Sequence, residues 1–251
     1  MSRIYRRLAI ALLVLSSPFR GIAAEAHIAV ATNFAEPIKA VAAVLEKTSG
    51  HSLKVTLGAT GKLYAQIKNG APFDVLLAAD TKAPAQLEAD GLVQAASRFT
   101  YATGKLVLWS ADATKVDGKG KVLTTGNFRK LAYASPKVAP YGAAALQVIE
   151  QLGLTNALAP KLVQGESIGQ TFGFVYTGNA ELGFVALSQV LEGGQLKSGS
   201  MWVIPQNLYQ PIRQDAVVLK RGATNPAAQA LMALLKSPNV KDLIRSYGYD
   251  I

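Results

Sequence analysis

The chain has 251 residues, of which 50% are hydrophobic and 17% charged, a balance typical of a globular protein and not of a disordered one. Its net charge is +10, but Lys and Arg are scattered and not clustered with aromatic residues, which argues against a nucleic-acid-binding protein. With no cysteine and only two histidines, the chain lacks the residues for a disulfide scaffold or a typical transition-metal site.

The first 24 residues have the pattern of a secretory signal peptide. Three arginines precede an apolar run over residues 8–15, which is too short to span a membrane, and small residues follow it. We predict cleavage after Ala24, with cleavage after Ala26 as the alternative. Removing residues 1–24 takes four arginines away and lowers the net charge to +6. An exported chain without a cysteine to carry a lipid predicts a periplasmic protein.

Strand and helix patterns alternate from His27 onward. The predicted elements are a strand at 27–31, a helix from Phe34 to Gly50, a strand at 53–57, a helix from Leu63 to Gly70 and a strand at 73–79. The last of these strands is a continuous apolar run, which is typical of a central parallel strand buried on both faces. Two strand–helix units followed by a third strand predict a doubly wound α/β sheet.

The middle of the chain repeats this plan. Strands are predicted at 105–109, 131–134, 162–163, 182–187 and 216–219, with helices after Pro140 and Ile168 and two closing helices near 226–235 and 240–247. Two extended crossings, residues 101–105 and 203–215, divide the pattern. We therefore predict two α/β lobes joined by two crossovers, with the ligand in a cleft between them. Lobe one comprises 25–103 plus 206–251, and lobe two comprises 104–205.

Four short turns each end a predicted buried strand and open a predicted helix. They are Ala31-Thr32-Asn33, Ala59-Thr60-Gly61, Pro140-Tyr141-Gly142 and Ser167-Ile168-Gly169. Free backbone N–H groups at a helix N-terminus favour anions, and α/β proteins place ligands beyond the carboxyl ends of their strands. Because the first three turns contain no charged residue, they predict a site that binds a small oxyanion without a counter-ion.

Each turn offers a different hydrogen-bond donor. Thr32 and Thr60 offer hydroxyls, Tyr141 a phenol, Asn33 amide and backbone N–H groups, and Ile168 its backbone N–H. Taken singly, Thr, Asn and Ser are ordinary helix caps. Four such turns on suitable strand ends, two in each predicted lobe, instead indicate one shared site.

A second pattern favours a different class of protein. Residues 165–169 match the G-x-S-x-G nucleophile elbow of serine hydrolases, with Ser167 as the nucleophile. That elbow needs a later histidine, and both His27 and His51 come before it, so we interpret Ser167 as a helix cap. Asp74 and Asp80, which flank a buried strand, are interpreted as structural.

Eight stretches spread along the chain match a known pattern. They are Val30–Phe34, Tyr64–Ile67, Asn69–Val75, Arg98–Ala102, Gly104–Ser110, Ala139–Gly142, Ser167–Gln170 and Leu182–Ala186. On these residues the chain resembles the molybdate-binding proteins of bacterial ABC importers, over nearly its whole length after the signal peptide. The resemblance implies the type II periplasmic binding-protein fold, with molybdate or tungstate bound between two lobes.

The resemblance also implies a set of ligand-binding residues: Thr32, Asn33, Thr60, Tyr141 and Ile168. Thr60 stands where the family often has Ser, and Tyr141 matches a donor found in one branch. Another branch has a ligating Tyr where this chain has Ala186. Molybdenum would then be bound only as the oxyanion through the five donors, with no cofactor and no catalytic residue.

We therefore expect a monomeric solute-binding protein, not an enzyme, that captures molybdate or tungstate and delivers it to a membrane permease. A receptor for sulfate or phosphate is the alternative, followed by an exported hydrolase that uses Ser167. Molybdate is a proton-free dianion that only accepts hydrogen bonds, so nearby carboxylates would repel it. Glu36 and Glu166 are the two carboxylates closest to the turns in sequence.

Overall fold

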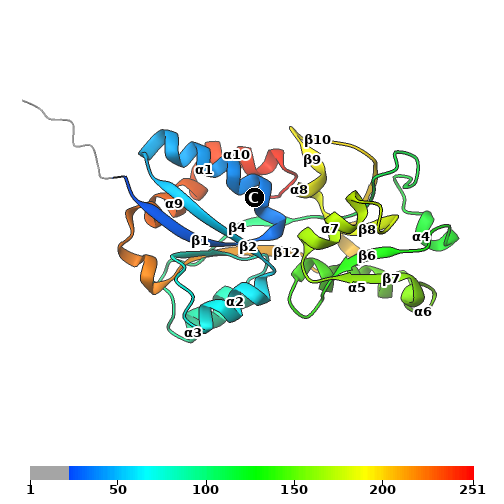
Figure 1. Ribbon diagram of the computed structural model, residues 1–251, viewed down its shortest axis with the longest axis horizontal. Coiled ribbons are helices and arrows are strands. Elements are labelled where there is room, and N and C mark those ends of the chain that lie inside the picture. The colour runs from blue at the N-terminus through cyan, green and yellow to red at the C-terminus, as the bar shows by residue number, and fades with distance from the viewer. Residues whose placement is uncertain (1–22) are drawn as a thin grey trace, which may run out of the picture.

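The computed structural model describes residues 23–251, so the predicted signal peptide lies, apart from its last two residues, outside the described part. Two β-sheets lie side by side along the long axis, each covered by helices (Figure 1). Over the described range, no helix combines the length and apolar character that crossing a membrane requires.

The first sheet has the strand order β2-β1-β3-β12-β4. Its strands are β1 (Glu25–Ala31), β2 (Ser52–Gly58), β3 (Val75–Leu77), β4 (Phe99–Gly104) and β12 (Ile212–Val218). β1 pairs in parallel with β2 and β3, whereas β12 is antiparallel to β3 and β4. β12, which lies between β3 and β4 in the sheet, comes from a part of the chain more than one hundred residues after both of them.

Helices cover both faces of this sheet. They are α1 (Ala35–Ser49), α9 (Pro226–Lys236) and α10 (Pro238–Ser246) on one face, and α2 (Thr60–Lys68) and α3 (Lys82–Ala89) on the other. Side chains of β3 alternate between the two cores: Val75 and Leu77 pack with α1, and Leu76 packs with α2. The prediction of a central strand buried on both faces is confirmed.

The second sheet has the order β11-β5-β8-β6-β7. Its strands are β5 (Leu106–Ser110), β6 (Leu131–Ala134), β7 (Leu162–Gly165), β8 (Leu182–Ala186) and β11 (Ser200–Val203). Its covering helices are α5 (Pro140–Gln151) and α7 (Ile168–Tyr176), with the shorter α4 (Val122–Thr125), α6 (Thr155–Leu158) and α8 (Leu187–Val190). A small ribbon of β9 (Leu191–Glu192) and β10 (Gln195–Leu196) follows α8.

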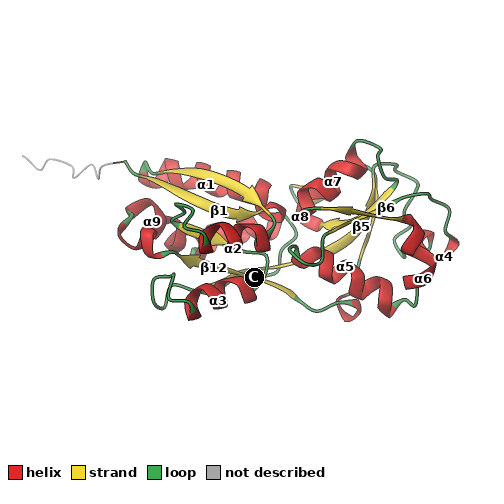
Figure 2. Ribbon diagram, turned by 60° about the horizontal axis from the view of Figure 1, so that its bottom comes forward, coloured by secondary structure: helices red, strands yellow, loops and turns green. Residues whose placement is uncertain are grey.

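The chain passes between the sheets twice. Only Lys105 separates β4 of the first sheet from β5 of the second, and the return runs from the end of β11 at Val203 to the start of β12 at Ile212. Both passages are visible between the two halves of Figure 2. Below, lobe one denotes the first sheet with its helices, and lobe two the second.

Several elements differ from the sequence predictions. The helix α3 and the strands β4 and β11 were not predicted. Polar residues interrupt the apolar ones in α3 and β4, and β11 is only four residues long. The strand predicted at 216–219 begins earlier, at Ile212. The expectation that each turn follows a buried strand is wrong for β2, an edge strand with exposed Val55 and Leu57.

Candidate functional site

The four predicted turns converge where the two lobes meet. One buried cluster contains residues next to or within every turn. From lobe one it includes Ala31, Ala59 and Ala79, and from lobe two Ala139, Tyr141, Ile168 and Ala186. Because these side chains pack in one cluster, the turns of lobe one face the turns of lobe two. The turns lie together within each lobe because β1 and β2 are parallel, as are β6 and β7, so that their carboxyl ends lie at the same edge of the sheet.

Direct contacts join the lobes around this cluster. The N–H of Gly61 donates to the carbonyl of Val138 at 2.9 Å, and Ser188 Oγ donates to the carbonyl of Asn33 at 2.7 Å. Gly169 lies so close to Thr32 that a Cβ atom built on it would be 2.6 Å from the Thr32 methyl carbon. The lobes are therefore closed on one another at the turns.

Thr60, the first residue of α2, is 1% exposed. Its Oγ1 accepts a hydrogen bond from the N–H of Ala79 at 2.9 Å. A hydroxyl that accepts here keeps its own proton for another acceptor. The hydroxyl proton of Thr60 is thus available for donation at the interface between the lobes.

Thr32 and Asn33 use their side chains within the protein. Thr32 Oγ1 donates to the carbonyl of Gly58 at 3.0 Å, and Asn33 Nδ2 donates to Gln214 Oε1 at 2.8 Å and to the Tyr249 hydroxyl at 3.0 Å. Both side chains were predicted to offer donors to a ligand, and in this conformation they do not. The backbone N–H groups of this turn, where the 3₁₀ helix Thr32–Phe34 begins, remain as the donors it can provide.

Tyr141 points from α5 into the same region and is 1% exposed. Its hydroxyl oxygen accepts from Gln214 Nε2 at 3.1 Å. Burial raises the pKa of Tyr141 well above its ordinary value, so the phenol stays protonated at neutral pH. It is therefore an uncharged O–H donor.

Ile168 is the first residue of α7, and the residue before it caps the helix. Ser167 Oγ accepts from the N–H of Gln170 at 3.2 Å, which confirms the interpretation of Ser167 as a helix cap. Within the described residues, the N–H groups of Thr32, Thr60 and Ile168 donate to no other group of the protein. Three helix starts thus present backbone donors at the meeting point of the lobes.

The two carboxylates that could oppose an anion are both paired with lysines. Glu36 contacts Lys39 at 2.7 Å on the exposed side of α1. Glu166 contacts Lys62 across the two lobes, with 73% of its side chain exposed. Neither carboxylate belongs to the buried cluster at the turns, so both lie outside the candidate site.

Within the described part of the chain, no histidine lies beside Ser167 to form a catalytic triad. His27 Nε2 contacts Thr56 Oγ1, and His51 Nδ1 accepts from the N–H of Ala24, so both histidines lie in lobe one, engaged away from α7. Across residues 23–251, no group of three or more His, Cys, Asp or Glu side chains gathers in a geometry that could hold a metal ion.

Asp74 and Asp80 have the structural roles predicted for them. Asp74 is 3% exposed, accepts from the N–H of His27 at 2.8 Å and contacts Arg221 at 3.2 Å. Asp80 accepts from the N–H of Ala83 in the first turn of α3 at 2.9 Å, and burial raises its pKa.

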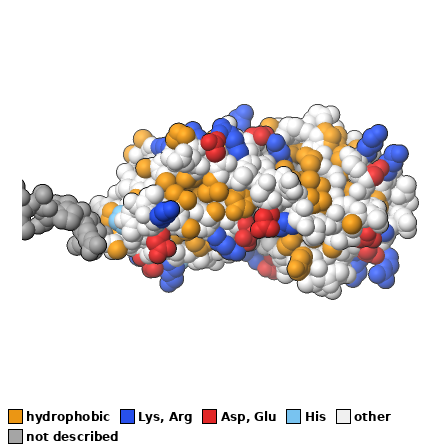
Figure 3. Space-filling view, turned by 90° about the horizontal axis from the view of Figure 1, so that it is seen from above, with side chains coloured by type: hydrophobic (Ala, Val, Ile, Leu, Met, Phe, Trp, Pro, Cys, Tyr) orange, Lys and Arg blue, Asp and Glu red, His pale blue; other side chains and the backbone are white. Residues whose placement is uncertain are grey.

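A groove of about 1120 Å³ lies between the lobes beside the turns. It is lined by the start of α2, the loop before α3, the loop before α5 and residues 210–213. Lys82, Lys137 and Arg213 are among its lining residues, but none of the five predicted donors is. On another side of the molecule, acidic and basic side chains are interspersed over the surface (Figure 3).

Several residues of this region escaped sequence analysis. Gln214 from β12, Tyr249 from the C-terminal segment and Ser188 from α8 all hydrogen-bond to Asn33 or Tyr141. The one available signal was the polar pair Gln214 and Asp215 directly before the apolar run of β12. Tyr249 and Ser188 carry no comparable signal, because only the tertiary structure brings them to Asn33.

Comparison with known proteins agrees with this fold. The model of the bacterial extracellular solute-binding protein family matches residues 26–250. The chain belongs to this family. The chain is similar to the molybdate-binding protein ModA of Azotobacter vinelandii, which is 56% identical over 229 residues covering 91% of each chain. The ModA of Rhodobacter capsulatus is 48% identical over 237 residues, covering 94% of this chain and 92% of its own.

The solved structures lead to the same fold. The periplasmic molybdate-binding protein of Azotobacter vinelandii superposes with a TM-score of 0.88 at 40% identity, covering 90% of this chain and 99% of its own. The sulfate-binding protein SubI of Mycobacterium tuberculosis has a TM-score of 0.71 at 13% identity, covering 90% of this chain and 86% of its own, which is a likeness of fold alone. The predicted α/β, two-lobe periplasmic binding-protein fold is confirmed. This solute-binding protein is not an enzyme, so the hydrolase alternative is wrong.

Proposed function

We propose that this protein captures molybdate in the periplasm and delivers it to the permease of an ABC transporter. The observation that carries the proposal is the 56% and 48% identity, over nearly the whole chain, to two proteins named for molybdate binding. The donor chemistry at the turns supports it, because a proton-free dianion requires donors and no acceptor. Tungstate, which resembles molybdate in charge and shape, is a further proposed ligand.

The proposed binding residues are the five predicted from the sequence, with roles revised by their hydrogen bonds. The hydroxyl oxygens of Thr60 and Tyr141 accept hydrogen bonds from the protein, and their protons are donated to the anion. Thr32, Asn33 and Ile168 donate through backbone N–H groups at helix starts. Each hydrogen bond to a charged partner stabilises by about 1.5–3 kcal/mol, so five together are compatible with nanomolar binding, about −12 kcal/mol.

In the proposed division into lobes, 25–103 plus 206–251 and 104–205, the donors come from both lobes and so couple anion binding to lobe closure. Donors from both lobes bind the anion only when the lobes are closed, so the anion shifts the population toward the closed form. We propose that the permease recognises that closed form of a monomer. Lys82, Lys137 and Arg213 in the neighbouring groove favour the approach of anions.

Export through the predicted signal peptide completes the proposal. β1 begins at Glu25 and pairs from its first residue with β2. Cleavage after Ala24 keeps that strand whole, whereas cleavage after Ala26 removes two of its paired residues. Sequencing the N-terminus of the exported protein tests this, and a mature chain that begins at His27 would contradict it.

Calorimetry of the mature protein with molybdate, tungstate, sulfate and phosphate tests the proposed ligand. We expect tight binding of molybdate and tungstate and weak or no binding of the other two. Sulfate that competes with molybdate at equal concentration would favour the alternative of a sulfate receptor.

Thr60→Ala tests the proposed donor set. We expect the Kd for molybdate to rise about tenfold or more, because one hydrogen bond to a charged group is lost. Thr60→Ser is the matched control, since it keeps the hydroxyl and should keep most of the affinity. Equal affinity of the Ala variant and the wild type would mean that the site lies elsewhere.

A further inference from the structure

Gln214 is a fully buried polar side chain for which the proposed site gives no direct role. It is 0% exposed and lies on β12, the strand by which the chain returns from lobe two to lobe one. Its amide contacts Asn33, Tyr101 and Tyr141. One side chain thus connects the first turn of lobe one with the phenol of lobe two.

A β-bulge fixes the position of Gln214. β12 pairs Gln214 with Ala102 and Asp215 with Thr100, so Tyr101 is an extra residue in β4 with no partner of its own. Bulges of this kind redirect the side chains beside them. Here the Tyr101 hydroxyl lies 3.0 Å from Gln214 Oε1.

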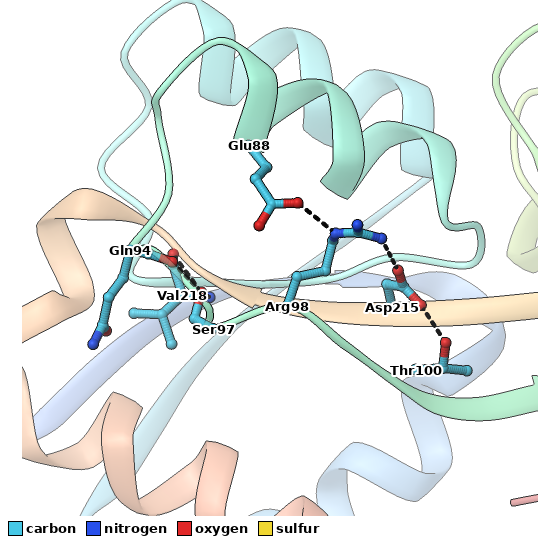
Figure 4. Close-up of polar contacts among 7 residues, drawn as sticks. All are labelled: Glu88, Gln94, Ser97, Arg98, Thr100, Asp215 and Val218. Atoms are coloured by element: carbon cyan, nitrogen blue, oxygen red, sulfur yellow. Dashed lines mark hydrogen bonds and ion pairs between the residues drawn. The ribbon is translucent and has the colours of Figure 1, made fainter.

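The residue after Gln214 is anchored on the other face of the sheet. Figure 4 shows Asp215 between Arg98 and Thr100, with Arg98 also contacting Glu88 of α3. Arg98 Nη1 donates to Asp215 at 2.9 Å and Thr100 Oγ1 donates to it at 2.7 Å. Because consecutive strand residues point to opposite faces, this anchor keeps Gln214 pointing toward the proposed site.

The contacts of Gln214 also give its amide a direction. Oε1 accepts from Asn33 Nδ2 at 2.8 Å, so Nε2 is the atom that faces the Tyr141 hydroxyl at 3.1 Å. An amide NH₂ group only donates. The Tyr141 oxygen must therefore accept, and its single proton is left for a different acceptor.

Gly104 provides the space for this arrangement. A Cβ atom built on Gly104 would be 1.9 Å from the Tyr141 hydroxyl and 2.5 Å from Gln214 Nε2. The absence of a side chain at the last residue of β4 therefore allows the phenol and the amide to meet. Two separate features, the bulge and this glycine, serve the same hydrogen bond.

We propose that Gln214 is a positioning residue that sets the Tyr141 hydroxyl to donate its proton toward the bound oxyanion. This inference rests on the proposed function, in which Tyr141 is one of the donors. An oxyanion offers only acceptors, so a phenol whose proton pointed to a protein group would present lone pairs to it. Accepting a hydrogen bond also makes the phenol a stronger donor, and an amide does so without adding a charge to the site.

The test is a double-mutant cycle of Gln214→Leu and Tyr141→Phe, read by calorimetry with molybdate. In the wild-type background we expect Gln214→Leu to raise the Kd about fivefold to tenfold, the cost of one hydrogen bond. In the Tyr141→Phe background we expect the same substitution to change the Kd by less than about twofold, because the proton it directs is gone. A thermal melt of each variant verifies folding, and Gln214→Met replaces the Leu variant if that one does not fold.

The matched control is the pair formed by Tyr133 and Gln164, whose side chains are also 3.1 Å apart but lie on the exposed part of lobe two. Gln164→Leu should leave the Kd unchanged. An equal loss on Gln214 substitution in both backgrounds would overturn the positioning role and leave the proposed function standing. If the wild type bound none of the anions, the proposed function would fall, and this inference with it.

Discussion

At the scale of single residues, the direction of each hydrogen bond decides what a side chain can offer a ligand. Thr32 and Thr60 are both threonines that begin a helix, yet Thr32 donates its proton to Gly58 whereas Thr60 accepts from Ala79. The same residue type in the same sequence context therefore has opposite roles. The residue types can be identified in the sequence, whereas the direction of their hydrogen bonds depends on partners that are distant in the chain.

Gly104→Ala tests the tight contact at the Tyr141 hydroxyl. The added methyl would lie 1.9 Å from that oxygen, so the phenol must move away from Gln214. We expect lower affinity for molybdate and a loss of about 1–3 kcal/mol in the free energy of unfolding, as in other overpacked cores. Calorimetry and denaturant melts measure the two effects.

Gly173→Ala is the control for this variant, because a Cβ on Gly173 meets nothing within 4 Å. It lies inside α7, where Ala is favoured over Gly by up to about 1 kcal/mol. We expect unchanged affinity and slightly higher stability. A Gly104→Ala variant that behaved like this control would contradict the packing described for Tyr141.

At the scale of elements, Glu181, which directly precedes β8, binds the residues that directly precede β6. Its carboxylate accepts from the N–H groups of Arg129 and Lys130 and contacts Arg129 Nε at 2.9 Å. Burial by itself would raise the pKa of Glu181, but these hydrogen bonds outweigh it and lower the pKa from 4.5 to about 2. A lowered pKa means that the ionised group stabilises the fold above its ordinary pKa, and that this stability is lost as the pH falls.

Glu181→Gln tests this link by its pH dependence. We expect the variant to have a smaller free energy of unfolding than the wild type at neutral pH. The difference should shrink as the pH falls from about 5 to about 2, where the wild-type carboxylate takes up its proton. Urea melts over this range measure it, and a pH-independent difference would contradict the assigned role.

Elements with a strong local pattern were predicted from the sequence, and elements without one were not. The strand β6 and the helix α7 occur where their apolar residues indicated. By contrast, β4 carries polar residues on one face and is held by its pairing with β12, which is more than one hundred residues away in the chain. No local pattern predicts such a partner.

At the scale of the whole molecule, an ion pair on the surface joins the two lobes. The ion pair between Lys62 and Glu166 crosses from lobe one to lobe two and is largely exposed. The hydrogen bond from Lys62 lowers the pKa of Glu166. Because this contact joins the two lobes, in the proposed mechanism it favours the closed form that binds the anion.

Glu166→Gln should weaken molybdate binding by at most about fivefold, since exposed ion pairs contribute little. It should also make the Kd less sensitive to salt, which screens the pair in the wild type. Calorimetry at low and high ionic strength tests both. Glu36→Gln is the matched control, because its partner Lys39 lies on the same helix and the pair does not join the lobes. Tighter binding by the Glu166 variant would show that this carboxylate opposes the anion.

The sequence by itself determined the fold class, the alternation of strands and helices, and the kinds of donor at the four turns. These follow from local periodicity and from residue chemistry, which depend on residues close together in the sequence and not on distant ones. Only the tertiary structure decided which donors keep a proton for a ligand. That outcome depends on Gln214, Ala79 and Gly58, each of which reaches its partner through strand pairing or packing that no short stretch of sequence encodes.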